Sequence, residues 1–218
     1  MGADNHADQG TLLAVEHVTV WRGDNLLLDD VCFALNAGQV LQVRGANGSG
    51  KTTLLRIVCG VGFSDEGLIK WRGDRIDKNA DQFNAELLYL GHKPGIKAAL
   101  TPVENLQIFC TLSGIDFSSA TDDAIRAALA QLALLPQAHL ACRHLSAGQQ
   151  RRVSLARLVL QPAKLWVLDE PLTSLDSAGL TWVENHISQH VASGGAVLLT
   201  THAPLNIDGV TVASLELG

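Results

Sequence analysis

The sequence predicts an α/β fold in which a helical subdomain is inserted into a core built around a parallel sheet, and three observations support this prediction. Residues 164–168 and 196–200 are short and nearly all apolar, as strands buried on both faces of a parallel sheet are. A glycine-rich segment at 45–52 stands between an alternating segment and a helical pattern. Residues from about 95 to 160 carry helical signals and separate the two parts of the core.

The N-terminal part of the chain is predicted to form antiparallel β-strands. Residues 1–10 are polar and acidic, so we expect a flexible tail, and residues 11–218 are expected to form one domain. From residue 11 to about 43, apolar residues alternate with smaller or polar ones, and residues 67–76 form a second group with strand character. We therefore expect an N-terminal antiparallel β-subdomain.

Capping signals define the helices predicted for the middle segment, residues 95–160. A capping box at 101–104 has proline at the first helical position, and Gly114 stands where the helix would end. A second helix is predicted from about 121 to 135, because its apolar residues recur at intervals of four and three. Pro136 is expected to end it.

Composition narrows the class of protein. A chain of 218 residues with 47% hydrophobic content can bury a full core in one domain. It has no apolar run near the roughly 18 to 20 residues that cross a bilayer, and its N-terminus does not resemble a signal peptide. The four cysteines lie far apart without a C-x-x-C pair, which disfavours a zinc site and predicts reduced, mostly buried thiols in a cytoplasmic protein. A net charge of −6 disfavours a nucleic-acid partner.

Residues 45–52 match the phosphate-binding loop pattern G-x-x-x-x-G-K-[ST]. The alternative is a flexible glycine turn, but a predicted strand at 39–43 precedes the segment and a predicted helix at 52–59 follows it, as the motif requires. Backbone N–H groups of such a loop surround phosphate oxygens, Lys51 can reach the β- and γ-phosphates, and Thr52 can hold Mg²⁺. The sequence thus predicts a P-loop NTPase core. Its candidate nucleotide-binding residues are Gly45, Ala46, Asn47, Gly48, Ser49, Gly50, Lys51, Thr52 and Thr53.

Two adjacent carboxylates, Asp169 and Glu170, follow the apolar segment 164–168. Ligands of open α/β sheets bind at the carboxyl ends of their strands, although a polar turn would also explain the two residues. Together with a phosphate-binding loop, the pair predicts a division of labour in phosphoryl transfer. Asp169 is expected to support Mg²⁺, and Glu170 is expected to orient or deprotonate the attacking water.

Residues 145–152 begin with Leu-Ser-Ala-Gly-Gln and open a predicted helix. Ser146 and Gln149 have capping-box spacing, and the positive end of the helix is also suited to bind the γ-phosphate of a nucleotide. The segment resembles the Leu-Ser-Gly-Gly-Gln signature of the ATP-binding cassette ATPases, with alanine in place of one glycine. Residues 174–176 are similar to the D-loop of that family, and 200–202 to the segment with its switch histidine. All five motifs occur in the family's order and cover nearly the whole chain.

This resemblance implies a catalytic dimer with ATP and Mg²⁺ as its ligands. Two ATP molecules would lie between head-to-tail protomers, with Ser146 and Gly148 of one chain facing the ATP held by the loop of the other. Lys51 and His202 would contact the γ-phosphate and stabilise charge in the transition state, and Asp176 would link the two sites. Closure on ATP and opening after hydrolysis would drive a permease.

Two positions depart from the pattern of the family. Where the family has the glutamine of its Q-loop, this chain has His92, which we expect to take a catalytic and Mg²⁺-ligating role through its imidazole. Where the family stacks an aromatic residue on adenine, this chain has Arg22. A guanidinium plane can stack on the base, and the neighbouring Trp21 would then be a core residue.

Residues 92–97, 145–152 and 200–206 resemble more narrowly the ATPase subunit of the bacterial cytochrome c maturation system, the haem exporter. That resemblance implies an ATPase at the cytoplasmic face of the bacterial inner membrane, docked on an integral membrane permease, which energises a haem-delivery step. Haem itself would be handled by partners, because the chain lacks Cys-x-x-Cys-His. His186 and His190 are interpreted as an exposed helix face rather than as haem ligands.

Three other functions are alternatives to this one. An ATPase for the permease of another solute would share every catalytic residue and remains the main alternative. A cassette protein that acts on DNA or ribosomes is disfavoured by the acidic charge and by the single nucleotide-binding unit. A nucleotide-binding scaffold without turnover is disfavoured because Lys51, Asp169, Glu170 and His202 are all present.

Overall fold

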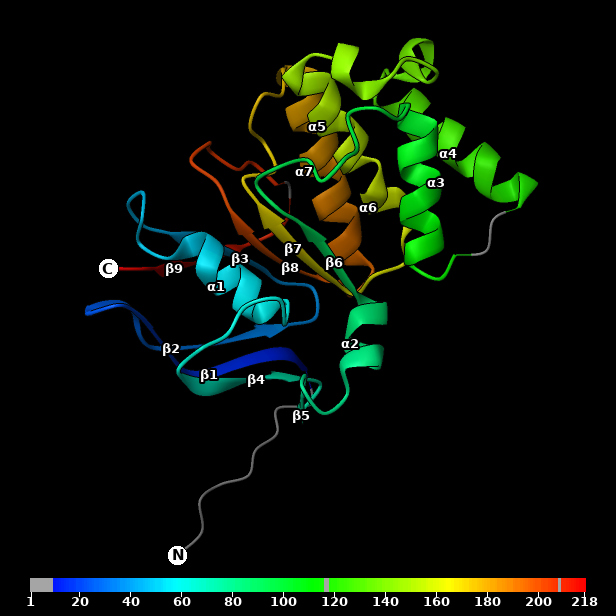
Figure 1. The fold of residues 1–218 in the computed structure, drawn as a ribbon. Coiled ribbons are helices and arrows are strands. Elements are labelled where there is room, and N and C mark those ends of the chain that lie inside the picture. The colour runs from blue at the N-terminus through cyan, green and yellow to red at the C-terminus, as the bar shows by residue number, and fades with distance from the viewer. Residues whose placement is uncertain (1–9, 116–117, 208) are drawn as a thin grey trace, which may run out of the picture.

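The fold is that of a computed structural model of the chain (Figure 1). It describes residues 10–115, 118–207 and 209–218, so nearly all of the predicted N-terminal tail lies outside the described part. Two sheets and a group of helices make up the α/β fold that the sequence predicts. Within the described ranges, none of the helices combines the length and the apolar character needed to span a membrane.

A five-stranded parallel sheet forms the centre of the protein. Every residue of its strands β7 and β8 is buried, which confirms the prediction that the two apolar segments are central strands. The edge strand β9 was not predicted, because most of its side chains are exposed and its sequence carries no apolar run. In order across the sheet the strands are β6 (Leu87–Leu90), β7 (Leu165–Asp169), β8 (Ala196–Thr200), β3 (Val40–Arg44) and β9 (Val212–Glu216).

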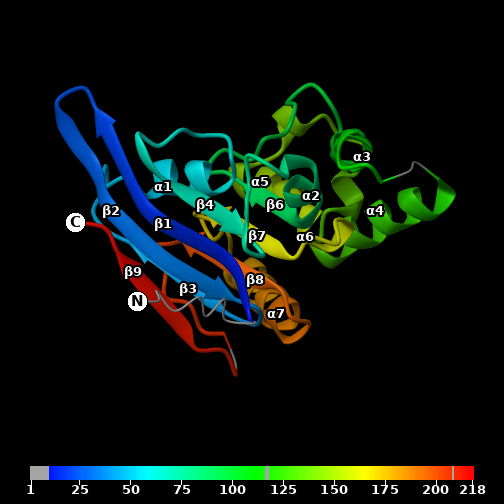
Figure 2. The same cartoon turned by 90° about the horizontal axis from the view of Figure 1, so that it is seen from below.

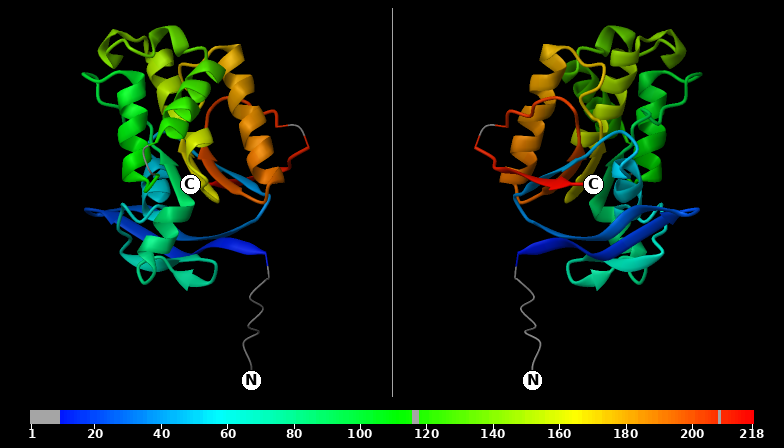
Figure 3. Two further views of the ribbon diagram at one scale, coloured as in Figure 1. Left: turned by 90° about the vertical axis from the view of Figure 1, so that its right-hand side faces the viewer. Right: turned by 90° about the vertical axis from the view of Figure 1, so that its left-hand side faces the viewer.

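A four-stranded antiparallel sheet covers one face of the parallel sheet and confirms the predicted N-terminal β-subdomain (Figures 2 and 3). Its strands, in order, are β2 (Asn25–Asn36), β1 (Thr11–Arg22), β4 (Glu66–Trp71) and β5 (Asp74–Arg75). Helix α1 (Lys51–Val58) packs between the two sheets through Leu54 and Leu55, which are fully buried. This packing fixes the start of α1 against the carboxyl ends of the parallel strands.

The helices other than α1 and α2 pack on the opposite face of the parallel sheet and form a second apolar core with it (Figure 3). Phe83 of α2 packs instead against Trp71 in the core beside the antiparallel sheet. Most of the helices in the second core lie between β6 and β7, which is the inserted helical subdomain that the sequence predicts. Helix α3 begins with the predicted capping box, in which Thr101 and Glu104 bond each other's backbone N–H groups. The helical elements are α2 (Ala80–Glu86), α3 (Pro102–Leu112), α4 (Ser119–Gln131), the 3-10 turns Leu135–Gln137 and Cys142–His144, α5 (Ala147–Leu155), α6 (Arg157–Leu160) and α7 (Ser177–Ala192).

Helix α4 ends earlier than predicted, at Gln131 rather than near residue 135. The N–H of Leu134 bonds to the carbonyl of Leu129, and the N–H of Ala133 bonds to that of Ala130. These two bonds are those of a Schellman ending, with Ala133 at φ 54° in the position that glycine usually occupies. The sequence has no glycine there, and the prediction that Pro136 ends the helix is wrong.

His190 is buried, contrary to its interpretation as part of an exposed helix face. Its ring stacks on Trp166 of β7, with ring centroids 3.9 Å apart and planes inclined by 6°. Burial lowers the pKa of His190 to about 4, although hydrogen bonding with the backbone of Ala196 and Lys164 partly opposes this shift. The imidazole is therefore neutral in the folded protein at neutral pH.

We expect the stability of the protein to fall between pH 6.5 and pH 4 partly because of His190. Within that range the unfolded state, with an ordinary histidine pKa, binds a proton that the folded state excludes, so acidification favours unfolding. The loss should be on the order of 3 kcal/mol across the range. Urea unfolding at a series of pH values measures it, and His190→Phe, which keeps an aromatic ring but cannot titrate, should show a smaller slope. Equal slopes for the two proteins would contradict this account.

Candidate active site

The phosphate-binding loop connects β3 to α1 in a tight turn. Gly45 and Gly50 have φ of 145° and 96°, which are backbone conformations that favour glycine. A Cβ atom on Gly45 would lie 2.5 Å from Ser49 Oγ and 2.7 Å from the carbonyl oxygen of Leu217, so a side chain does not fit there. No side chain of the described residues caps the first turn of α1, and its N–H groups are available to an anion.

Lys51 is the first residue of α1, and its side chain folds back over the loop. Its Nζ donates hydrogen bonds to the carbonyl oxygens of Gly45, at 2.7 Å, and Ala46, at 2.9 Å. The ammonium group is thus held beside the amides that would surround a phosphate, which gives the loop a net attraction for anions.

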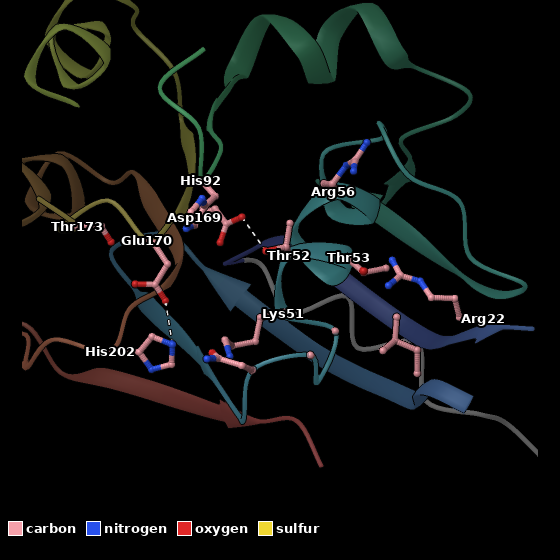
Figure 4. Close-up of a pocket in the computed structure, with 14 residues that line it drawn as sticks. Arg22, Lys51, Thr52, Thr53, Arg56, His92, Asp169, Glu170, Thr173 and His202 are labelled. Carbon is pink, nitrogen blue, oxygen red and sulfur yellow. Dashed lines mark hydrogen bonds and ion pairs between the residues drawn. The ribbon is translucent and has the colours of Figure 1, made fainter. Parts of the chain in front are cut away.

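Asp169 lies at the end of β7 and is 1% exposed. One of its carboxylate oxygens accepts a hydrogen bond from Thr52 Oγ1 at 2.9 Å, and the other accepts one from Thr200 Oγ1 at 2.8 Å (Figure 4). Two of the three predicted Mg²⁺ ligands, Thr52 and Asp169, therefore come together although they lie 117 positions apart in the chain.

Thr200 was not predicted as a site residue, yet it holds both carboxylate residues in place. Its hydroxyl donates to Asp169 and also accepts the backbone N–H of Glu170 at 2.9 Å. The sequence signal for this role is the position of Thr200 at the end of an apolar segment. The structure pairs the end of that segment, β8, with the end of β7.

Replacing Thr200 with valine, which has nearly the same shape, should lower the free energy of unfolding by about 2 kcal/mol. It leaves a buried carboxylate oxygen of Asp169 without its partner, and hydrogen bonds to charged groups contribute about 1.5 to 3 kcal/mol. The N–H of Glu170 loses the hydroxyl but keeps the backbone carbonyl oxygen of Thr200, at 3.2 Å. Thr200→Ser keeps the hydroxyl and serves as the matched control. Urea unfolding of the three proteins gives the comparison, and a valine variant as stable as the serine variant would show that these bonds contribute little.

Glu170 follows the end of β7 with φ 51°, a left-handed conformation that non-glycine residues seldom adopt. Its Oε1 is buried and has no hydrogen-bond partner among the described residues. His202, from the segment after β8, places Nε2 3.5 Å from this oxygen (Figure 4). The structure thus brings two of the predicted catalytic residues, Glu170 and His202, into contact, and Glu170 Oε1 accepts no hydrogen bond from the described residues.

Arg151 of helix α5 connects this helix to the ends of strands β6 and β7. The sequence did not predict this role. This guanidinium, only 3% exposed, donates hydrogen bonds to the carbonyl oxygens of residues on either side of the site. Burial lowers the pKa of Arg151, while the nearby Asp169 and Glu170 carboxylates oppose the shift. The acceptors are the carbonyls of Gly91 at 3.0 Å, Asp169 at 2.9 Å, Pro171 at 3.2 Å and Glu170.

A cleft of about 500 Å³ gathers most of the predicted site residues. His92 and Arg22 both line it, together with Glu170, His202 and the loop residues from Asn47 to Thr53 other than Ser49. Figure 4 shows His92 near Asp169 and shows Arg22 at the far end of the cleft. Gly45 borders a neighbouring cavity that Lys51 and His202 also line.

Trp21, weighed as a core residue, is 51% exposed and is not among the residues that line the cleft. Its backbone N–H donates to Asp65 at 2.7 Å. Arg22, rather than Trp21, therefore faces the cleft.

Three predicted residues, Ser146, Gly148 and Asp176, do not line the cleft of their own chain. Ser146 and Gln149 form the capping box at the start of α5. Gly148 lies against the backbone of the D-loop-like segment, since a Cβ atom on it would be 2.5 Å from the carbonyl oxygen of Ser174.

Asp176 caps α7 by accepting the N–H of Gly179 at 2.9 Å, and both of its carboxylate oxygens accept from Arg152 at 2.6 Å. These contacts lower the pKa of Asp176, the bond from Gly179 most and that from Arg152 next. Asp176 thus has a structural role within its own chain, and its carboxylate is ionised at neutral pH.

Comparison with known proteins places this arrangement in a family. The family model described as "ABC transporter" matches residues 28–173. The cytochrome c biogenesis ATP-binding export protein CcmA of Vibrio vulnificus (strain CMCP6) is 44% identical over 95% of this chain and 100% of its own length. Proteins of the same name from Yersinia pseudotuberculosis (strain IP32953) and Hahella chejuensis are 45% and 40% identical, over 89% and 96% of this chain and 87% and 97% of their own lengths.

Solved structures agree with the fold. An ATP-binding subunit of an ABC transporter superposes with a TM-score of 0.78 at 24% identity, covering 88% of this chain and 80% of its own. An ATP-binding cassette solved as a dimer with ADP and Pi in a post-hydrolysis state gives 0.76 at 21% identity, covering 88% of each chain. With a family model over most of its length and end-to-end relatives above 40% identity, the chain belongs to the ABC transporter ATPases and, within them, to the cytochrome c biogenesis ATP-binding export proteins.

Proposed function

We propose that this chain hydrolyses ATP to energise a haem-delivery step in the biogenesis of c-type cytochromes, as the ATPase subunit of a membrane transporter. The observation that carries the proposal is the 44% identity to a cytochrome c biogenesis export protein across 95% of this chain and the whole of that protein. The cleft supports the catalytic half of the proposal, because it joins an anion-binding loop to two carboxylates.

ATP is the substrate in this proposal, and the loop residues 45–53 bind its phosphates. Lys51 exchanges the carbonyls of Gly45 and Ala46 for oxygens of the β- and γ-phosphates, and the N–H groups of the first turn of α1 donate to the same anion. Arg22, at the far end of the cleft, is positioned to stack its guanidinium on the adenine ring.

The residues around Asp169 fit Mg²⁺. Hydroxyl and carboxylate oxygens are the ligands this ion prefers, and neighbouring ligands of an octahedral Mg²⁺ at about 2.0 to 2.1 Å lie about 2.9 Å apart. Thr52 Oγ1 and Asp169 Oδ2 are separated by that distance, 2.9 Å. When bound, the ion neutralises charge on the phosphates. His92 lines the same cleft, and its imidazole would hold the ion or hydrogen-bond to the attacking water.

Glu170 and His202 perform the proton and charge chemistry. Oε1 of Glu170 accepts a proton from the water that attacks the γ-phosphate, because no hydrogen bond from the described residues occupies this buried oxygen. His202 Nε2, 3.5 Å from this oxygen, is placed to donate to the γ-phosphate as negative charge develops on it.

A second copy of the chain completes each site. Ser146 and Gly148 lie at the start of α5, away from the cleft of their own chain, and their amides face the γ-phosphate of the partner in a head-to-tail homodimer. Asp176, beside them, links the two sites through the dimer interface. Opening of the dimer after hydrolysis provides the movement that drives the transporter.

The chain acts at the cytoplasmic face of the bacterial inner membrane as a peripheral subunit docked on an integral membrane permease. Haem is handled by those partners. The sequence has no Cys-x-x-Cys-His segment, and His186 and His190 are each stacked on a tryptophan rather than directed at one another. No nucleic acid takes part, in keeping with the net charge of −6.

Deletion of the gene from its native host tests this function. Cells that lack the chain should lose covalently haem-bound c-type cytochromes while keeping b-type haemoproteins, and a plasmid copy should restore the c-type set. Haem staining of denatured membrane proteins measures the first class, and difference spectra measure both. Normal c-type cytochromes in the deletion strain would contradict a role in this pathway. The chain would then be the ATPase for a permease of another solute.

A further inference from the structure

Three potential metal ligands meet on the antiparallel sheet, away from the nucleotide cleft. His17 of β1 and Asp30 and Cys32 of β2 each offer one ligand atom, and these atoms all lie within 4.8 Å of one another. All three residues are exposed, and none lines the cleft. Figure 2 shows the two strands running side by side along the sheet. The cluster has no part in the binding or hydrolysis of the nucleotide described above.

Irregularities in both strands create the cluster. The pairing of β1 with β2 shifts register between Val15 and Val18, and His17 within that shift has φ 54°. Asp30 on the facing strand has φ 46°. A left-handed backbone conformation costs on the order of 1 to 3 kcal/mol at a non-glycine residue, and such strain is concentrated at functional sites. Two such residues on facing strands therefore indicate that this geometry serves a function.

The distance between sulfur and nitrogen in the cluster fits a tetrahedral zinc ion. With Zn–S of about 2.3 Å and Zn–N of about 2.0 to 2.1 Å, tetrahedral ligands place sulfur and nitrogen about 3.6 Å apart. Cys32 Sγ and His17 Nδ1 are separated by 3.6 Å. His17 Nδ1 and Asp30 Oδ1 are 2.7 Å apart in a hydrogen bond, and they would need to separate to about 3.4 Å when an ion replaces the shared proton.

Two backbone contacts support ligation by these side chains. The N–H of His17 donates to Cys32 Sγ at 3.1 Å, which fixes the sulfur beside the backbone of the histidine ligand. The N–H of Asp30 donates to Thr19 Oγ1 at 3.2 Å and fixes the backbone of the carboxylate ligand. A thiolate and a carboxylate also carry the two negative charges that balance a divalent cation.

We propose that His17, Asp30 and Cys32 bind Zn²⁺, or a divalent ion of similar ligand preference, with water in the fourth position. Thiolate and imidazole select such ions over Mg²⁺ and Ca²⁺, which prefer oxygen ligands. The absence of a C-x-x-C pair led sequence analysis away from zinc, because the ligands here come from neighbouring strands rather than from one loop. The bound ion would clamp β1 to β2 within the sheet that carries Arg22.

Cobalt titration of the tag-free, nucleotide-free full chain tests the site. Co²⁺ should bind one per chain with a thiolate charge-transfer absorption band, and Zn²⁺ should abolish the band. Cys32→Ser should remove the band. His17→Asn and Asp30→Asn, which suit the left-handed backbone, should each weaken binding by more than the roughly 10- to 100-fold that follows loss of a residue hydrogen-bonded to a ligand.

The exposed His139, outside the cluster, provides the matched control, since His139→Asn should leave the titration unchanged. Absence of the band in the unaltered protein, or its persistence in Cys32→Ser, would overturn the proposal.

Alkylation of the unaltered protein gives a second measurement that needs no folded variant. Cys32 is exposed and the other three thiols, Cys59, Cys110 and Cys142, are buried, so iodoacetamide should label Cys32 first. One equivalent of Zn²⁺ should slow that labelling at least about tenfold, as mapped by mass spectrometry, because a coordinated thiolate is no longer free to react. Labelling of Cys32 at the same rate with and without Zn²⁺ would overturn the proposal.

Discussion

Glu170→Gln should lower ATP hydrolysis by the purified protein at least about 100-fold and leave nucleotide affinity nearly unchanged. A positioned general base contributes about 100- to 10,000-fold, and the amide keeps the size of the side chain but cannot accept the proton of the attacking water. The buried Oε1, which accepts no hydrogen bond from the described residues, is the atom on which this expectation rests. Phosphate release measures turnover, and equilibrium dialysis with Mg·ATP measures binding.

Glu66→Gln serves as the matched control for this experiment, since it makes the same chemical change at an exposed position on β4 outside the cleft. The Glu170 variant should also remain longer in the ATP-bound dimer, which the mass measured in solution would show. Turnover by Glu170→Gln at a rate near that of the Glu66 control would contradict the assignment of Glu170 as the base.

Arg151→Met should destabilise the protein by on the order of 3 kcal/mol and slow ATP hydrolysis in the protein that remains folded. The change removes the donor from four backbone carbonyls, those of Gly91, Asp169, Glu170 and Pro171, in a site closed to water. Arg151 does not line the nucleotide cleft, so we expect it to act as a positioning residue that fixes Glu170 and the segment before His92 relative to one another.

Arg157→Met is the matched control, because Arg157 is half-buried and donates to one carbonyl, that of Gly95, at 2.7 Å. Urea unfolding compares the stabilities, and kcat and KM for ATP are measured well below the melting temperature. A positioning role predicts a lower kcat at 151 with little change in KM. If kcat at 151 equals that of the 157 control in fully folded protein, Arg151 stabilises the fold without positioning the site.

The elements that sequence predicted well are those whose signals are local. Residues 45–52 specify a loop through glycine positions and a lysine, and the buried strands β7 and β8 have apolar residues throughout. Thr101 and Glu104 mark the start of α3 because both capping contacts lie within one helical turn. Each of these patterns can be recognised from residues that are close together along the chain.

The features that sequence missed depend on partners distant in the chain. Arg151 bonds to residues 18 to 60 positions away, and Thr200 reaches Asp169 across 31 positions. His190 is interpreted correctly only when Trp166 is known to lie beside it. The cluster of His17, Asp30 and Cys32 likewise depends on a shift in strand pairing that no composition rule specifies. The resemblance to a family placed His92 and Arg22 at the nucleotide site, and both line the cleft.

The central claim is that ATP turnover by this chain energises c-type cytochrome biogenesis, and the most direct measurement replaces Glu170 with Gln in the native chromosome. Covalently haem-bound c-type cytochromes are then quantified at matched levels of the wild-type and variant chains. We predict that c-type cytochromes are lost while b-type haemoproteins persist. Normal c-type cytochromes in cells that contain the variant chain alone would contradict the claim.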